Sequence, residues 1–263
     1  MQAPVTVALA ALLLVGLTGC GLAADDSTAD TTSHQPPAIG DCRMLTPSDL
    51  DRPSNDSPLV GCGSAHTAET FEVETIPDEV AEGGLDNPAL GTFVYKTCNS
   101  GFRRFLGGEE SAVMRSMLTW AWFRPTREEW NAGARWYRCD AVGGGEQSTT
   151  FVNLPRTARG LLLGRPEDRW MVCVDGPSVN GAEKIPCSQK HTWRAATTIV
   201  LGKDTDPYPG DRLVEIRTRD FCSDSVGAWM NYPVDYDFGY TWFHEAEWKA
   251  GNRRSICWAR TNR

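Results

Sequence analysis

The chain has 263 residues, of which 41% are hydrophobic and 23% charged, and its formal net charge is −8. This length suits one large or two small domains, and the composition is that of a globular protein rather than a disordered one. Residues 1–160 hold 12 basic and 20 acidic side chains, whereas residues 161–263 hold 14 of each. Because neither half has a basic excess that could bind a phosphate backbone, we expect no nucleic acid partner.

The first residues are typical of an export signal. Val5 to Leu17 form an apolar run that is too short to span a bilayer as a helix. The run ends in Leu17-Thr18-Gly19-Cys20, which resembles the lipobox of bacterial lipoproteins, although no Lys or Arg precedes it. The resemblance implies a signal peptide over residues 1–19 and a lipid on Cys20. We therefore expect the protein to be anchored at the extracytoplasmic face of the cell membrane; a plain secretory signal or a buried strand is the alternative.

Residues 20–40 predict a flexible tether behind this anchor. The segment is small, polar and acidic, and it contains no aromatic residue. Such a segment cannot bury enough apolar surface to offset the entropy lost on ordering. We expect it to hold the folded part of the chain close to the membrane surface.

The rest of the chain reads as two related modules, residues 41–142 and 169–263, joined by a glycine-rich linker at residues 143–168. Outside the cytosol, an even set of cysteines normally forms disulfides. Four cysteines allow three pairings in each module, and the sequence does not choose among them. We favour the first with the second and the third with the fourth, which would clip the opening strands together and pin a helix to the closing strand. The favoured pairs are Cys42–Cys62, Cys98–Cys139, Cys173–Cys187 and Cys222–Cys257.

The helix of each module is predicted around its third cysteine. In the first module Asn87 and Pro88 mark the helix start, and Gly107 marks its end. The apolar residues between them recur at spacings of three and four, which predicts one buried face: Leu90, Val94, Cys98, Phe102 and Phe105. In the second module we expect Asp211 to cap the helix. Its predicted apolar stripe is Leu213, Phe221, Cys222, Val226 and Trp229.

A repeated phrase closes each module. Glu128–Cys139 and Ala246–Cys257 share six of twelve positions. Thr126 and Glu129 have the spacing of a capping box, and Gly133 suits the left-handed position that ends a short helix. The second copy has His244 at the cap, a weaker start. We therefore predict an α+β fold of two related small modules, each an antiparallel sheet packed by one main helix and stapled by disulfides.

These features resemble the actinobacterial septum formation family. The residues that carry the resemblance are Gly40-Asp41-Cys42, Cys62 with His66, Cys98 with Phe102 and Phe105, and Trp130 with Gly133 and Cys139. The second module departs at its start, because Cys173 lies only 14 residues before Cys187 and no Gly-Asp precedes it. The resemblance implies an exported envelope protein associated with division. It supplies no catalytic residue.

Metal binding and catalysis find little support in the sequence. His66 and His191 each follow a cysteine as C-x3-H, but zinc needs about four converging ligands and this pattern supplies two. We expect both rings to be structural, bonded to backbone or to a carboxylate, and we expect no metal or cofactor. Neither G-x-S-x-G nor H-E-x-x-H occurs. We therefore expect a protein that is not an enzyme, with an envelope hydrolase as an alternative.

The aromatic residues offer the other candidate site. The chain has ten tryptophans, and small modules need large side chains to build a core. Strand alternation puts Trp120 and Trp122 on one face and Ala121 and Phe123 on the other. An exposed set of Trp120, Trp122 and Trp242 would suit cell-wall glycan. The sequence thus favours a non-catalytic binding or scaffolding role with envelope or division proteins, and a glycan- or ligand-binding lipoprotein is the alternative.

Overall fold

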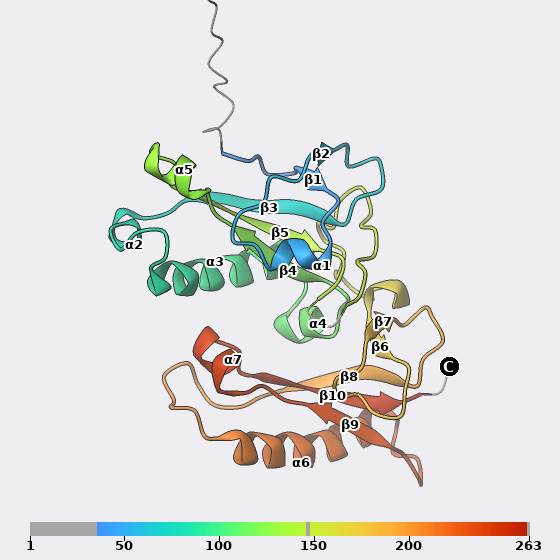
Figure 1. Ribbon diagram of the computed structural model, residues 1–263. Coiled ribbons are helices and arrows are strands. Elements are labelled where there is room, and N and C mark those ends of the chain that lie inside the picture. Colours follow the sequence, from blue (N-terminus) through green and yellow to red (C-terminus); the bar gives the residue numbers. More distant parts are fainter. Residues whose placement is uncertain (1–35, 146–147, 262–263) are drawn as a thin grey trace, which may run out of the picture. The chain divides into compact units, whose positions relative to one another are not determined.

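A computed structural model of the protein describes residues 36–145 and 148–261. The predicted signal peptide, Cys20 and residues 20–35 of the tether lie outside the described residues. The described part contains two five-stranded sheets, and each sheet is packed by one long helix (Figure 1). Every strand pair is antiparallel. The predicted α+β class with two related modules is confirmed.

The two sheets have the same strand order. The order is β2-β1-β3-β5-β4 in the first and β7-β6-β8-β10-β9 in the second. The first module comprises β1 (Cys42–Arg43), α1 (Pro47–Leu50), β2 (Leu59–Val60), β3 (Ala68–Thr75), α2 (Asp78–Ala81), α3 (Pro88–Leu106), α4 (Glu110–Met114), β4 (Thr119–Phe123), α5 (Arg127–Asn131) and β5 (Trp136–Val142). The second comprises η2 (Asp168–Trp170), β6 (Val172–Val174), β7 (Lys184–Pro186), β8 (Trp193–Val200), α6 (Asp211–Trp229), β9 (Phe238–Thr241), α7 (Glu245–Ala250) and β10 (Arg254–Arg260).

Helix α3 forms as its sequence predicts. The Asn87 side chain accepts a hydrogen bond from the amide of Ala89, Pro88 is the first helical residue, and Gly107 ends the helix in the left-handed conformation. The five predicted core residues of the helix are all buried against the sheet. This face is the largest apolar cluster of the first module.

Helix α6 differs from its prediction in two ways. Gly210 is the N-cap, and the Asp211 carboxylate instead accepts from the Tyr208 hydroxyl and lies 3.3 Å from Nδ1 of His244. Leu213, Phe221 and Trp229 are exposed. The buried positions are Val214, Thr218, Cys222, Val226 and Gly227. Small and polar residues therefore take places on the buried face, and the weak apolar periodicity of this segment hid the correct face.

The repeated phrase forms the same local structure twice. Thr126 and Glu129 form the predicted capping box at the start of α5, and Gly133 has a φ of +105°. At α7 the box is formed with His244, and Gly251 has a φ of +108°. After each glycine the chain enters the strand that carries the last cysteine of the module, β5 or β10.

Four disulfides staple the modules. They join Cys42 to Cys62, Cys98 to Cys139, Cys173 to Cys187 and Cys222 to Cys257. These are the pairs that we favoured among the three pairings open to each module. One bridge of each module lies at the opening strands, and the other ties the long helix to the closing strand.

The segment between the modules packs on the first sheet. The amide of Gly143 donates to the carbonyl of Thr67, and the amide of Leu154 donates to the carbonyl of His66. Leu154, Ala158 and Leu162 are buried in the same core cluster as α3. The glycine run at residues 143–145 is thus tied to the first module at its start.

Residues 110–117 of the first module also contact the second sheet. Glu110 forms an ion pair of 2.7 Å with Arg254, and the Arg115 guanidinium donates to the carbonyl of Ala196. Met117 is buried in the apolar cluster of the second sheet. Over the part of the chain that the structure describes, no helix has the length and apolar character needed to cross a membrane.

Candidate functional site

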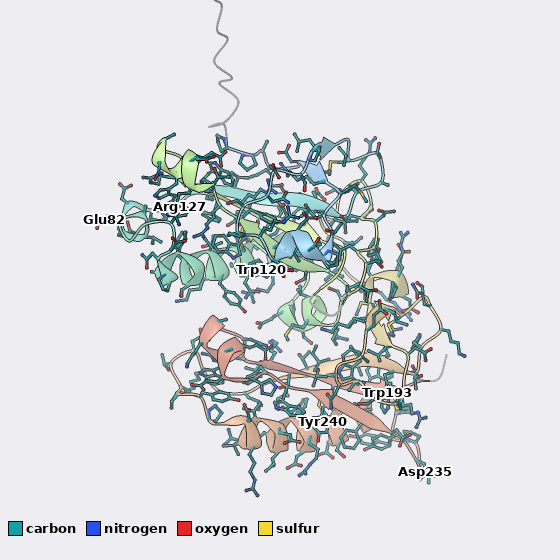
Figure 2. The ribbon with its side chains drawn as sticks, viewed as in Figure 1. Glu82, Trp120, Arg127, Trp193, Asp235 and Tyr240 are labelled. Atoms are coloured by element: carbon teal, nitrogen blue, oxygen red, sulfur yellow. A yellow bond between two sulfur atoms is a disulfide. The ribbon has the colours of Figure 1, made fainter. Side chains whose placement is uncertain are left out.

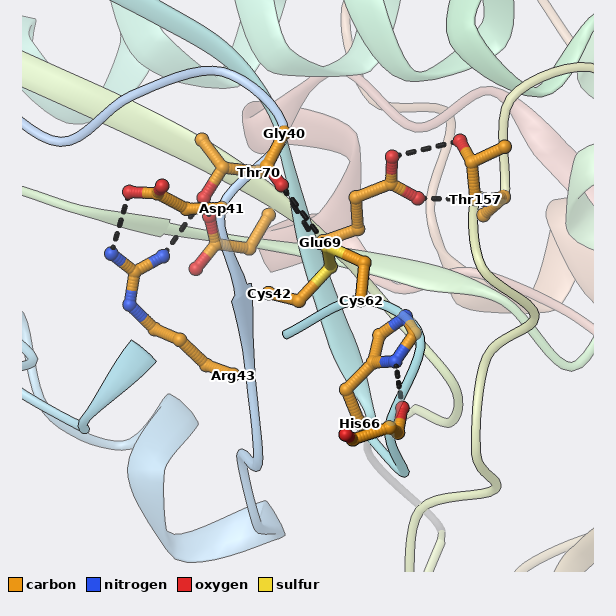
Figure 3. The surroundings of a disulfide bond; sticks show 12 residues. Gly40, Asp41, Cys42, Arg43, Cys62, His66, Glu69, Thr70 and Thr157 are labelled. Atoms are coloured by element: carbon orange, nitrogen blue, oxygen red, sulfur yellow. Dashed lines mark hydrogen bonds and ion pairs between the residues drawn. A yellow bond between two sulfur atoms is a disulfide. The ribbon is translucent and has the colours of Figure 1, made fainter. Parts of the chain in front are cut away.

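A continuous set of polar side chains lies on the first sheet, on strands β1, β3 and β5. The Arg43 guanidinium donates to the Asp41 carboxylate at 3.1 Å and to Oγ1 of Thr70 at 3.0 Å (Figure 3). Thr70 in turn donates to Oδ1 of Asp140 at 2.7 Å, and Arg138 donates to Oδ2 of the same carboxylate at 3.1 Å. We call these five residues the polar chain.

Four residues of the polar chain are buried, and Asp41 is half-buried. Arg43, Arg138 and Asp140 are 5%, 3% and 0% exposed. Burial lowers the pKa of the Arg138 guanidinium, and the nearby Asp140 carboxylate opposes that shift. The Phe123 ring lies 4.6 Å from the Arg138 guanidinium carbon and covers one face of it. Taking such charges out of water costs several kcal/mol per ion, so a buried ion pair is weak support for stability.

The polar chain forms part of the wall of a cavity of about 660 Å³. A cavity of this size is in the range that holds small ligands. Its wall combines β1 and β5 with the loop before β2 and the start of the described chain. The lining residues are Pro36, Pro37, Ala38, Asp41, Arg43, Ser54, Asn55, Asp56, Ser57, Leu59, Arg124, Thr126, Glu129, Trp136 and Arg138. We call this space the polar cavity.

The wall of the polar cavity contains unpaired donors. Among the described residues, the buried Nε of Arg43, Nε of Arg124 and Nε1 of Trp136 have no hydrogen-bond acceptor. A buried donor without an acceptor costs about 1–3 kcal/mol. These three atoms have almost no accessible surface, and other buried atoms without a partner occur elsewhere in the described residues, so they do not by themselves mark a ligand site.

The second module has an apolar equivalent of the polar chain. Strand pairing aligns the two sheets residue by residue, because Thr70 pairs with Asp140 as Ala195 pairs with Trp258. The first and last cysteines of a module are flanked by Asp41 and Arg43 and by Arg138 and Asp140 in one copy. In the other copy they are flanked by Val172 and Val174 and by Ile256 and Trp258. These four apolar residues are buried together in one cluster.

Comparing the two modules shows what their common fold requires. The same strand order and equivalent disulfides form with an apolar set in one module and with buried charges in the other. Replacing a buried ion pair by packed apolar residues is often neutral or stabilising. The fold therefore does not require the polar chain, and a ligand that contacts the polar cavity would explain it.

Two of the predicted binding residues lie on the first sheet. Trp120 and Trp122 are half-buried and pack against the α3 core, while Ala121 and Phe123 are buried on the opposite face. The Trp120 ring (Figure 2) meets the ring of Tyr95 of α3 edge-on, with the two ring centroids 5.4 Å apart. The two tryptophans line a groove of about 380 Å³ together with residues 50–53.

Trp242, the third predicted binding residue, belongs to the second module. Its ring centroid lies 5.7 Å from that of Tyr240 and 5.9 Å from that of His244. The side chain packs on the cluster around Phe243 and Trp248. The structure thus brings Trp120 and Trp122 together and places Trp242 at a separate site.

The two histidines of the C-x3-H motifs each lie beside a backbone carbonyl, one of the two kinds of partner expected for them. Nδ1 of His66 lies 2.8 Å from the carbonyl oxygen of Ser64, and Nδ1 of His191 lies 2.7 Å from that of Gln189. Both rings are buried, and neither Nε2 has a partner in the described part of the chain. Within residues 36–145 and 148–261, no group of three or more His, Cys, Asp or Glu side chains could hold a metal ion.

Sequence reasoning missed the polar chain and Trp136. The sequence-based predictions used the positions that the two modules share. The signal for the polar chain lies at positions where the two modules differ. The residues beside the equivalent cysteines are charged in the first copy and apolar in the second. A comparison of these flanking positions would have found Asp41, Arg43, Arg138 and Asp140.

In a comparison with protein families, the chain matches one family. The septum formation family matches residues 114–257, which is more than half of the chain. The match runs from the end of α4 through β4 and β5 and on to the last cysteine of the second module. No curated protein matches the chain, and no solved structure matches it.

Proposed function

Because the chain belongs to the septum formation family, we propose that it acts in cell division as a non-catalytic binding protein of the cell envelope. The polar cavity is the binding site in this proposal. The observation that carries it is the contrast between the buried charges of the first module and the apolar residues at the same positions in the second.

A binding role accounts for features that a purely structural role leaves unexplained. Arg43 and Arg138 are fixed by partners in the protein, yet they also line an open space of about 660 Å³. Preorganised donors around a cavity are typical of ligand sites, because the cost of arranging them is met during folding. The apolar counterpart in the second module offers no such donors.

A lipid on Cys20 would hold this site at the outer face of the cell membrane. The proposal rests on the tetrapeptide Leu17–Cys20 after a short apolar run. Cys20→Ala should give an unprocessed or released protein, whereas the native protein should partition into detergent. A native protein that stays in the aqueous phase, with its mature N-terminus elsewhere, would contradict the anchor.

Imaging tests the division role. A fluorescent fusion at the C-terminus should concentrate at division sites, and depletion of the protein should delay or misplace septa. Uniform envelope staining together with normal septation after depletion would remove the division role.

Substitution of the histidines tests the absence of catalysis. His66, His191 and His244 are replaced together by Gln, and circular dichroism checks that the variant folds. Septation should be unchanged, because two of these rings are buried on backbone carbonyls. Loss of septation with an intact fold would instead indicate a catalytic or metal-binding histidine.

A further inference from the structure

We propose that the polar cavity binds a carboxylate that has an N–H donor beside it, as in a free amino acid or the C-terminal residue of a peptide. This inference rests on the proposed binding role and adds the chemical class of the ligand. It comes from the cavity wall alone: which donors are fixed, which acceptors are already used, and how the charges balance.

Two guanidinium groups form the deepest part of the wall. The Arg43 and Arg138 side chains are only 6% and 4% exposed. Thr70 and Asp41 fix the first, and Asp140 and the Phe123 ring fix the second. A guanidinium presents planar N–H groups that match the two oxygens of a carboxylate. Because both groups are held in place, a ligand loses little by ordering them.

Acceptors in the deep part of the wall, near Arg43 and Arg138, are already used by the protein. The Asp41 carboxylate already accepts from Arg43 and from the amide of Ala38. Oδ1 of Asn55 accepts from Arg138 and from the amide of Ser57. The buried N–H groups of Arg43, Arg124 and Trp136 also have no acceptor in the described part of the chain, but they have almost no accessible surface, so they can report on binding without contacting the ligand. Arg43 and Arg138 therefore dominate the deep part of the wall, where guanidinium N–H groups favour the oxygens of a ligand carboxylate.

The charge balance selects among acceptor ligands. Three arginines line the cavity, at positions 43, 124 and 138, and three carboxylates line it, at positions 41, 56 and 129. Because these charges cancel and Asp140 lies directly behind Arg138, a dianion such as phosphate is disfavoured. A carboxylate with a neighbouring donor fits better. Asp56 is exposed and Glu129 is half-buried, so both lie nearer the solvent than Arg43 and can accept from an ammonium or amide N–H.

NMR titration of the full folded chain tests this assignment. Four probes vary the amino or the carboxyl end of glycine: glycine, glycylglycine, N-acetylglycine and glycinamide. Inorganic phosphate is the fifth probe. The readouts are the indole N–H resonance of Trp136 and the Nε–H resonances of Arg43 and Arg124. Glycine and N-acetylglycine separate a free amino acid from a peptide terminus, and glycinamide removes the carboxylate.

We expect saturable shifts with glycylglycine and with at least one of glycine and N-acetylglycine, and none with glycinamide. Arg43→Val should weaken binding by about tenfold or more, since it removes charge-assisted hydrogen bonds. Arg219→Val is the matched control, because this arginine is exposed on α6, and it should bind as the native protein does. If Arg43→Val fails to fold, Trp136→Phe provides the second variant; it removes the indole signal and leaves the arginines in place, so the Arg43 resonance should still shift.

Equal shifts with glycinamide, tighter binding of phosphate than of every carboxylate, or no saturable shift with any probe would overturn the assignment. These outcomes are separate from a failure of the proposed function. If the fusion protein concentrates at division sites and the probes do not bind, the ligand class is wrong and the division role stands. If the probes bind and depletion leaves septation normal, the carboxylate site stands and the division role falls.

Discussion

The two modules share their strand order, their long helix and their pair of disulfides, and they differ on the sheet face that lies away from the helix. In the first module this face holds the polar chain and opens into the polar cavity. In the second, Val172, Val174, Ile256 and Trp258 fill the equivalent positions and are buried with Met117 of the first module. In the second module this face is thus covered by apolar contacts, while in the first it holds buried charges, two of which line the polar cavity.

This contrast separates the residues that recur in both modules from those that occur in one module only. Cysteines, the glutamates of the α5 and α7 capping boxes, and the glycines that follow these helices recur in both modules. The charged residues beside Cys42 and Cys139 occur in one module only. A feature that one copy can lose without losing the fold is a better candidate for binding than a feature that both copies keep.

The largest effect is expected from breaking the buried ion pair. Arg138→Met should destabilise the protein by about 3–5 kcal/mol, because Asp140 would stay buried with only Thr70 as a partner. Adding Asp140→Leu should recover most of the loss. Unfolding in guanidinium chloride under oxidising conditions measures the stability of the single and of the double variant. A loss below about 1 kcal/mol for the single variant would mean that the pair is screened as at a surface.

The disulfides should not distinguish the modules. Cys98→Ala/Cys139→Ala opens a loop of 41 residues and Cys222→Ala/Cys257→Ala one of 35. In the chain-entropy view each bridge contributes about 4 kcal/mol, so the two double variants should lose nearly equal stability. Thermal unfolding of the two variants compares them. A much larger loss in one module would show that the bridges are not equivalent.

The helix caps should differ slightly. Thr126 accepts a hydrogen bond from the amide of Glu129 at 3.2 Å, and Thr126→Ala should cost about 1 kcal/mol. Histidine is a weaker N-cap, so His244→Ala should cost a few tenths of a kcal/mol. Equal losses in urea unfolding would show that the His244 box is as strong as the Thr126 box.

The smallest effect is a pH dependence that belongs to the first module. Burial raises the pKa of Glu72 above 4.5, and Arg104 opposes the shift; Thr197 takes the equivalent position opposite Cys257. A raised carboxyl pKa favours folding below the unfolded value, and this contribution is lost as pH rises through the folded value. Glu72→Gln should therefore flatten the stability profile above pH 4.5 and slightly stabilise the protein at pH 7. A stability profile that Glu72→Gln leaves unchanged would refute this.

More of the fold than of the candidate site could be predicted from the sequence. The α3 face and the caps at Asn87 and Thr126 follow from local periodicity and side-chain chemistry. The four disulfides were favoured among three pairings per module, and only the structure selects them. The buried face of α6 could not be predicted from its apolar pattern. Packing decides which residues are buried there, because Thr218 and Gly227 are buried while Phe221 and Trp229 are exposed. The polar cavity joins β1, β5 and the loop before β2, and such long-range proximity leaves no local pattern.

Septation tests the central claim most directly, in cells whose protein carries two residues of the second module at the equivalent positions of the first. Asp41→Val/Arg43→Val gives the first cysteine of the first module the neighbours that Cys173 has in the second, and it removes both charges of one ion pair. Arg219→Val/Asp220→Val removes an exposed ion pair of the same chemistry from α6 and serves as the control. With both proteins folded and produced at native levels, we predict that the first variant fails to restore septation in depleted cells and that the second restores it. Full restoration by the first variant would contradict the claim that the polar chain of the first module is where this protein binds.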